Sequence, residues 1–226
     1  MPQEDGPRIS VNKLGEYLVQ ADSARRRRII QDQKQPIGRI VSAYREAKDA
    51  IVQVLMGAGG PTLLQRATQL ASDRSGTTKA VTNRQNSVLA LEKFVDVLQE
   101  LPEGVVYVTP PRRPAPLTIA GVDVSVAPDL LVHAAGKDAP IIGALKLHFP
   151  KDDERALGAN GSQFVAVLLH RWLLANPIGA RRVAPELCLS VDVFRQSVHC
   201  APRAQQRRLE RIEDGCEEIA ARWPRL

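Results

Sequence analysis

The stretch VDVSVAPDLLVHAAGKDAPIIGALKLHF, residues 122–149, decides the predicted fold. It contains two extended apolar runs joined by a polar turn with a glycine, a pattern typical of paired β-strands. In residues 141–149 the side chains alternate between two faces, and Lys146 shares its face with Ala144. Because an unpaired buried ammonium is costly, we expect an acid or a bound anion beside Lys146. Asp129, in the first run, is the acid that we expect to compensate it.

Composition places the chain among ordinary globular proteins. Its 226 residues are long enough to bury a sizeable core, with 44% hydrophobic and 25% charged residues. No apolar run approaches the length of a membrane span, so we expect no membrane partner. Cys188, Cys200 and Cys216 are widely spaced and fit neither a disulfide framework nor a CxxC metal site. This usage predicts a reducing, cytoplasmic location.

The formal net charge of +6 is compatible with a polyanionic partner. Four consecutive arginines follow an Asp22-Ser23 cap, and on a helix they spread round most of the circumference. Two interpretations stay open: the helix grips phosphates, or its arginines are solvated and paired with nearby acids such as Glu16, Asp22 and Asp32. A stiff basic connector, PPRRPAP at residues 110–116, adds two more arginines. The candidate nucleic-acid contacts are therefore Arg25, Arg26, Arg27, Arg28, Arg112 and Arg113.

Hydrophobic periodicity divides the chain into two parts. Residues 1–60 form a predicted helical region, which ends in the Gly-rich linker at 57–61. Residues 61–226 form a predicted α/β core with a C-terminal helix. The expected helices cover residues 12–21, 24–35, 37–56, 62–71, 78–101, 155–174 and 203–223. The expected strands cover residues 105–108, 117–126 with a bend at Ala120-Gly121, the paired runs of the stretch quoted above, 187–193 and 197–200.

The core order of helix, three strands, helix and strand carries a family resemblance. Pro128-Asp129 stands before a strand, and Lys146 follows 17 positions later in the next strand. Over roughly residues 78–201, this resembles the PD-(D/E)XK nuclease superfamily, which has the restriction-endonuclease-like fold. The resemblance implies an α/β fold with a mixed central sheet. It also implies Mg²⁺-dependent cleavage of phosphodiesters, in which two acids bind the metal and the lysine positions and polarises the attacking water.

Carried over by position, Asp129 matches the metal-binding aspartate and Lys146 the catalytic lysine. Ala144 stands two residues before Lys146, where the family has Asp or Glu. Two replacements for the missing acid are open. Glu92 or Asp96, from an acidic stripe on the preceding helix, is one source of a metal ligand. Gln163, on the helix after the lysine strand, resembles a catalytic glutamine of one branch, although Val167 stands where that branch has tyrosine.

The resemblance leaves two function classes open. The first is a nucleic-acid-binding protein of the nuclease type, with Mg²⁺-dependent cleavage through Asp129 and Lys146, and with His148 as a further ligand or proton carrier. The second is a catalytically inactive nuclease scaffold that dimerises or docks a protein partner through its N-terminal helices. The sequence contains no phosphate loop, dinucleotide-binding glycine motif, HExxH or GxSxG that would indicate other chemistry.

Overall fold

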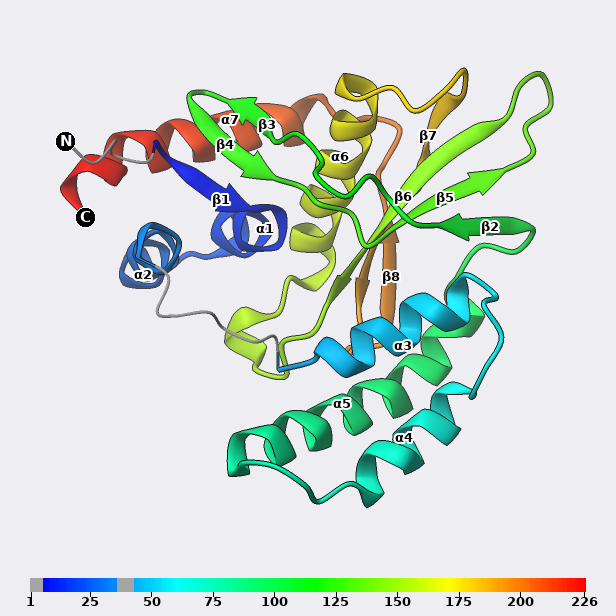
Figure 1. Ribbon diagram of the computed structural model, residues 1–226. Coiled ribbons are helices and arrows are strands. Elements are labelled where there is room, and N and C mark those ends of the chain that lie inside the picture. Colours follow the sequence, from blue (N-terminus) through cyan, green and yellow to red (C-terminus); the bar gives the residue numbers. More distant parts are fainter. Residues whose placement is uncertain (1–5, 36–42) are drawn as a thin grey trace.

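A five-stranded mixed sheet forms the centre of the fold (Figure 1). The computed structural model describes residues 6–35 and 43–226. The strand order is β2-β5-β6-β7-β8, and only β6 and β7 run parallel, joined by helix α6 (Gly158–Ala175). A parallel pair requires such a crossover. The strands are β2 (Val105–Val108), β5 (Leu130–Ala134), β6 (Ile141–His148), β7 (Arg182–Asp192) and β8 (Ser197–Cys200).

A second, three-stranded sheet lies beside the first. Its order is β1 (Arg8–Ser10), β4 (Val122–Ser125) and β3 (Leu117–Ile119), with β1 parallel and β3 antiparallel to β4. The bend predicted at Ala120-Gly121 is the turn of the β3–β4 hairpin, where φ is 46° and 76°. Both values lie in the left-handed region that short hairpin turns require.

The first extended run of residues 122–149 is divided between the two sheets. β4 belongs to the small sheet, whereas β5 pairs with β6 in the large one. The break falls at Ala127, whose φ of 37° is unusual for a residue with a Cβ. The predicted hairpin is therefore confirmed for β5 and β6, but the strand that precedes it in sequence turns away.

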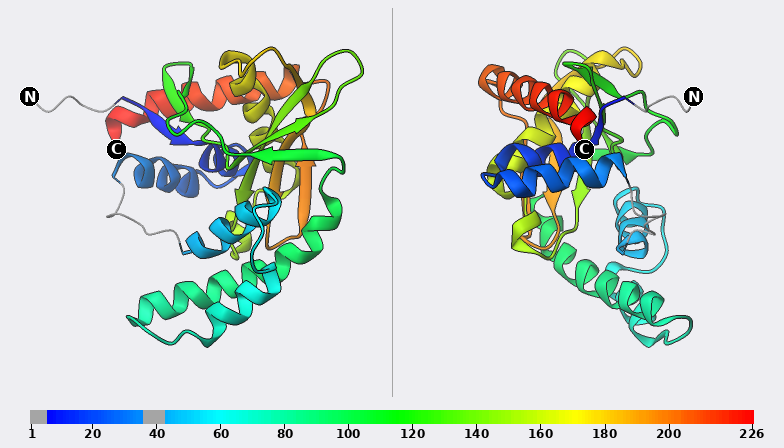
Figure 2. Two further views of the ribbon diagram at one scale, coloured as in Figure 1. Left: turned by 45° about the vertical axis from the view of Figure 1, so that its right-hand side comes forward. Right: turned by 90° about the vertical axis from the view of Figure 1, so that its left-hand side faces the viewer.

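Strand β6 sends its side chains alternately to two hydrophobic clusters. Leu145 and Leu147 pack with buried residues of helices α3 (Arg45–Leu55) and α5 (Thr78–Val97). Ala144, on the other side, joins the cluster that includes α6. The alternation predicted for this strand is confirmed, and each face of the sheet is covered by helices (Figures 1 and 2).

A β-bulge interrupts β7 opposite Gly143 of β6, because Val183 pairs with Ile142 and Cys188 already pairs with Ala144. The register with β7 shifts between Ile142 and Ala144. A Cβ added at Gly143 would lie 2.1 Å from the carbonyl oxygen of Leu187 in β7. Glycine is required here because two backbones meet where a side chain would stand.

The N-terminal helices pack against the core rather than forming one separate unit. Helix α1 (Val11–Val19) contacts α6 at Gly15, where an added Cβ would be 2.9 Å from Val165 Cγ2. Helix α2 (Ser23–Lys34) packs beside β1 and α1, whereas α3 packs with α5 and α4 (Leu63–Ser72). The predicted division at residue 60 therefore does not separate the packing groups. Of the helix predicted at 37–56, residues 37–42 lie outside the described part.

The remaining helices complete an α/β architecture, as predicted. Helix α7 (Gln206–Arg222) packs on α1, α6 and β4. The described residues also form the short 3-10 turns η1 (Leu98–Glu100), η2 (Asp153–Arg155) and η3 (Trp223–Arg225). Helices α4 and α5 extend away from the sheet as an arm in both views (Figure 2). Across residues 6–35 and 43–226, no helix has the length and apolar character needed to cross a membrane.

Candidate functional site

Asp129 and Lys146 lie side by side at the start of β5. Leu130 pairs with Leu145, so the next position along each strand places Asp129 opposite Lys146. The Lys146 Nζ atom is 3.4 Å from Asp129 Oδ1, and the side chains are only 15% and 3% exposed. The other carboxylate oxygen accepts a 2.8 Å hydrogen bond from the backbone N–H of Leu147. The acid expected beside the strand lysine is therefore present and held by the strand itself.

Lys146 makes a second contact that explains the unusual backbone of Ala127. Its Nζ donates to the Ala127 carbonyl oxygen at 2.5 Å. Burial lowers the pKa of Lys146 from its ordinary value, and the neighbouring Asp129 carboxylate opposes this shift, while Lys48 adds to it. The left-handed turn at Ala127 thus supplies a carbonyl that solvates a largely buried ammonium.

A second lysine, Lys48, completes the cluster from helix α3. Its Nζ lies 2.5 Å from Asp129 Oδ1, closer than Lys146. Sequence reasoning missed this residue, because it stands on an amphipathic helix far from Asp129 in the chain. Its neighbours Ala47 and Ile51 are fully buried, which shows that this face of α3 meets the core. That spacing alone does not distinguish Lys48 from a solvated lysine at the edge of the same face.

The residues around Asp129 do not fit a Mg²⁺ site. Mg²⁺ is bound by oxygen ligands, usually carboxylates. Here one carboxylate faces two ammonium groups, and Ala144, which has no ligand atom, is fully buried. In the described ranges, no group of three or more His, Cys, Asp or Glu side chains is arranged to hold a metal ion.

The proposed substitutes for the missing acid lie elsewhere. Glu92 is on the exposed face of α5 and makes no ion pair or hydrogen bond with any residue in the described part of the chain. Asp96 accepts a hydrogen bond from Gln196. Gln163 accepts one from Arg208 of α7. None of the three contacts Asp129 or Lys146, so the structure does not bring the predicted ligand set together.

A groove of about 610 Å³ opens at the carboxyl end of β6, where its lining begins at Leu147, the residue after Lys146. Asn12 of α1 reaches into the same region, where its amide donates to the Leu147 carbonyl at 3.0 Å. Tyr44 stacks on Phe149 with 5.3 Å between ring centroids. The polar and aromatic lining includes Asn12, Lys13, Tyr44, His148, Lys151 and Arg155.

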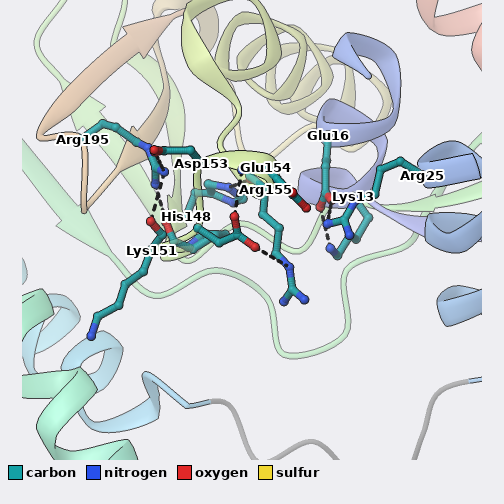
Figure 3. A network of polar contacts seen from close by, with 11 residues as sticks. Lys13, Glu16, Arg25, His148, Lys151, Asp153, Glu154, Arg155 and Arg195 are labelled. Carbon is teal, nitrogen blue, oxygen red and sulfur yellow. Dashed lines mark hydrogen bonds and ion pairs between the residues drawn. The ribbon is translucent and has the colours of Figure 1, made fainter. Parts of the chain in front are cut away.

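The groove lining contains three bases, Lys13, Lys151 and Arg155, and one acid, Asp152. Figure 3 shows how the three bases lie. Lys13 lies 2.5 Å from the buried Glu16, which also binds Arg25 at 2.9 Å. Arg155 is 3.7 Å from Asp152 and half exposed. One acid shared by two bases leaves excess positive charge on this side of the groove.

His148 forms part of the groove lining and is held neutral. Its Nε2 donates to the Arg155 carbonyl over 3.0 Å, which leaves Nδ1 as an acceptor in the neutral ring. Burial is the main cause that lowers the pKa of His148 to about 4, against the favourable charge of Asp192. The histidine is therefore uncharged at neutral pH and not a cationic phosphate ligand.

This shift predicts a loss of stability in acid. The unfolded chain protonates His148 near pH 6.5 and the folded chain near pH 4, so the unfolded state binds more protons between these values. Between pH 7 and pH 5, His148 should lower the free energy of unfolding by about 2 kcal/mol. Urea unfolding of the wild type and of His148→Gln at both pH values isolates this contribution. An equal pH dependence of the two proteins would contradict the assignment.

The arginine run divides into internal and exposed members. Arg25 pairs with Glu16, and Arg26 pairs with Glu218 of α7 at 3.0 Å. Arg27 and Arg28 are exposed, although Arg28 lies 3.8 Å from Asp32. Two of the four arginines thus fasten α2 to its neighbours, as the pairing interpretation expects, and two remain available at the surface.

The basic connector holds its arginines outward. Arg112 and Arg113 are exposed and form no ion pair with any described residue. The connector itself is anchored, because the Trp172 indole N–H donates to the Ala115 carbonyl at 2.8 Å. Both arginines are therefore presented from a fixed segment.

Comparison with protein-family models, with curated proteins and with solved structures finds no match for this chain.

Proposed function

We propose that the chain is a nucleic-acid-binding protein with a restriction-endonuclease-like core that binds phosphates without metal-dependent cleavage. The observation that carries this proposal is the Asp129–Lys146 pair on adjacent strands, completed by Lys48 instead of a second acid. The pair supports the fold assignment, and the second ammonium weighs against hydrolysis.

The order of elements supports the nuclease-like core. Helix α5, strands β2, β5 and β6, helix α6 and strand β7 follow one another, with β3 and β4 inserted after the first strand. The four strands lie in the order β2-β5-β6-β7 within the large sheet. Asp129 and Lys146 occupy the positions that the resemblance assigns to the conserved acid and lysine.

Hydrolysis lacks the groups that it would need. A metal-bound water requires a bound cation, and the only carboxylate of this cluster is shared by two ammonium groups. Ala144 offers no ligand. We therefore favour binding over the Mg²⁺-dependent nuclease predicted from the resemblance.

The groove supports phosphate as the ligand chemistry. Lys13, Lys151 and Arg155 line it, and the stacked Tyr44–Phe149 pair provides an apolar wall. A groove with cations and aromatic rings suits a single strand, whose phosphates and bases meet the two kinds of group. The alternative of docking through the N-terminal helices is less favoured, since α1 is buried against α6.

Binding should be measured by fluorescence anisotropy with single- and double-stranded DNA and RNA over a range of salt. The triple variant Lys13→Ala, Lys151→Ala and Arg155→Ala should weaken binding and reduce the salt slope by up to about 3. The matched control is Lys79→Ala with Lys93→Ala, two exposed lysines of α5. Absence of binding at low salt, or equal binding by the triple variant, would refute the proposal that the groove binds nucleic acid.

Cleavage is tested separately with the same oligonucleotides and Mg²⁺ or Mn²⁺. We expect no products above those of Lys146→Ala. Metal-dependent cleavage that disappears in Lys146→Ala would show that the protein is an active nuclease.

A further inference from the structure

Lys48 stands where a cation beside Asp129 would stand. Its Nζ is 2.5 Å from Asp129 Oδ1, although the lysine is 41% exposed and the aspartate 3% exposed. An exposed lysine commonly keeps its ammonium in water, because a surface ion pair adds little stability. Here the ammonium instead reaches inward to a buried carboxylate.

Both oxygens of the Asp129 carboxylate are already engaged. Oδ1 faces the ammonium groups of Lys48 and Lys146, and Oδ2 accepts the Leu147 N–H at 2.8 Å. One negative and two positive charges leave the cluster with a net charge of +1. A divalent ion approaching Asp129 would meet two ammonium groups at close range, which is strongly unfavourable.

The residues before and after Lys48 on the same face of the chain are packed against the core. Tyr44, one turn earlier, stacks on Phe149 with an interplanar angle of 11°. Ala47 and Ile51, on the adjoining positions, are fully buried in the cluster that α3 shares with α5 and the sheet. Packing on the same helical face therefore fixes the backbone of Lys48 within reach of the Asp129 carboxylate.

We infer that Lys48 is a built-in counter-ion, which takes the place of a metal beside Asp129 and keeps the cluster closed to divalent cations. The contact also joins helix α3, which packs on the arm of α4 and α5, to the strand that carries Lys146. This inference concerns the cluster itself and holds whether or not the groove binds nucleic acid.

The test reverses one charge. Lys48→Glu would place a second carboxylate beside Asp129, and two carboxylates suit a hard divalent ion. In this variant we expect Mn²⁺ to raise the Tm by about 3–5 °C at a tenfold excess over its Kd. Wild type, Lys48→Met and the double variant Lys48→Glu with Asp129→Asn should show no such rise. Lys79→Glu, at an exposed position of α5 with no acid three or four residues away, is the control for the added negative charge.

Two outcomes would overturn the inference. The first is a Mn²⁺-dependent rise in the Tm of the wild type that Asp129→Asn abolishes. The second is a Lys48→Glu variant whose Tm responds to Mn²⁺ no more than that of Lys79→Glu. If Lys48→Glu does not fold, acylation of the wild-type protein decides: Lys48 should react more slowly than exposed Lys93, and equal rates would refute the contact.

Discussion

Asp129→Ala should lower the free energy of unfolding by about 3–5 kcal/mol, the range for removing one partner of a buried charge pair. The change would leave the Lys146 ammonium, which is only 15% exposed, with the Ala127 carbonyl as its remaining partner. It would also leave the Leu147 N–H without its acceptor. We assign little of the loss to Lys48, because its exposed side chain can return to water.

Urea denaturation followed by circular dichroism measures this effect. The matched control is Asp123→Ala in β4, where the exposed carboxylate accepts a 2.8 Å hydrogen bond from Thr118. The control should cost no more than about 1 kcal/mol. Similar losses for the two variants would contradict the role of Asp129 as the partner that stabilises the buried Lys146 ammonium.

The second large effect is expected at Gly143 of β6, opposite the bulge in β7. Gly143→Ala would place a methyl group 2.1 Å from the Leu187 carbonyl oxygen and 2.4 Å from its carbonyl carbon. Both atoms belong to the backbone of β7, so relief requires the two central strands to separate. We expect a loss of about 3 kcal/mol, at the upper end for overpacked sites.

Thermal and urea unfolding of Gly143→Ala should be compared with Gly6→Ala. No heavy atom lies within 4 Å of the Cβ position at Gly6, so that substitution should be nearly neutral. A stable Gly143→Ala protein would show that the pairing of β6 with β7 is looser than the register indicates.

Most of the element order was predictable from periodicity, but the division into two sheets was not. The alternation in β6 predicted which side chains face each helical layer, and the burial of Leu145 and Leu147 confirms it. The break at Ala127 has no sequence signal, because positive φ is usually associated with glycine or asparagine. Its stabilising contact comes from Lys146, which only the folded chain brings near.

Only the part of the site that follows from strand pairing was predictable from the sequence. Asp129 and Lys146 lie on adjacent strands of one hairpin, so their proximity follows from local register. Lys48 arrives from a helix whose docking depends on the whole core. The same dependence on tertiary structure explains why Arg25 and Arg26, indistinguishable in sequence from Arg27 and Arg28, are held by Glu16 and Glu218.

The pairing of β1 with β4 has a consequence for synthesis of the protein. Ile9 lies opposite Val124, so the first strand cannot pair until the ribosome has released the chain beyond that partner. Helix α1 can pack only later still, since its contact at Gly15 is with Val165 of α6. By contrast, α3, α4 and α5 contact one another within a single continuous segment and can associate early. During translation α3, α4 and α5 should therefore associate first, while the residues that precede them remain exposed to chaperones.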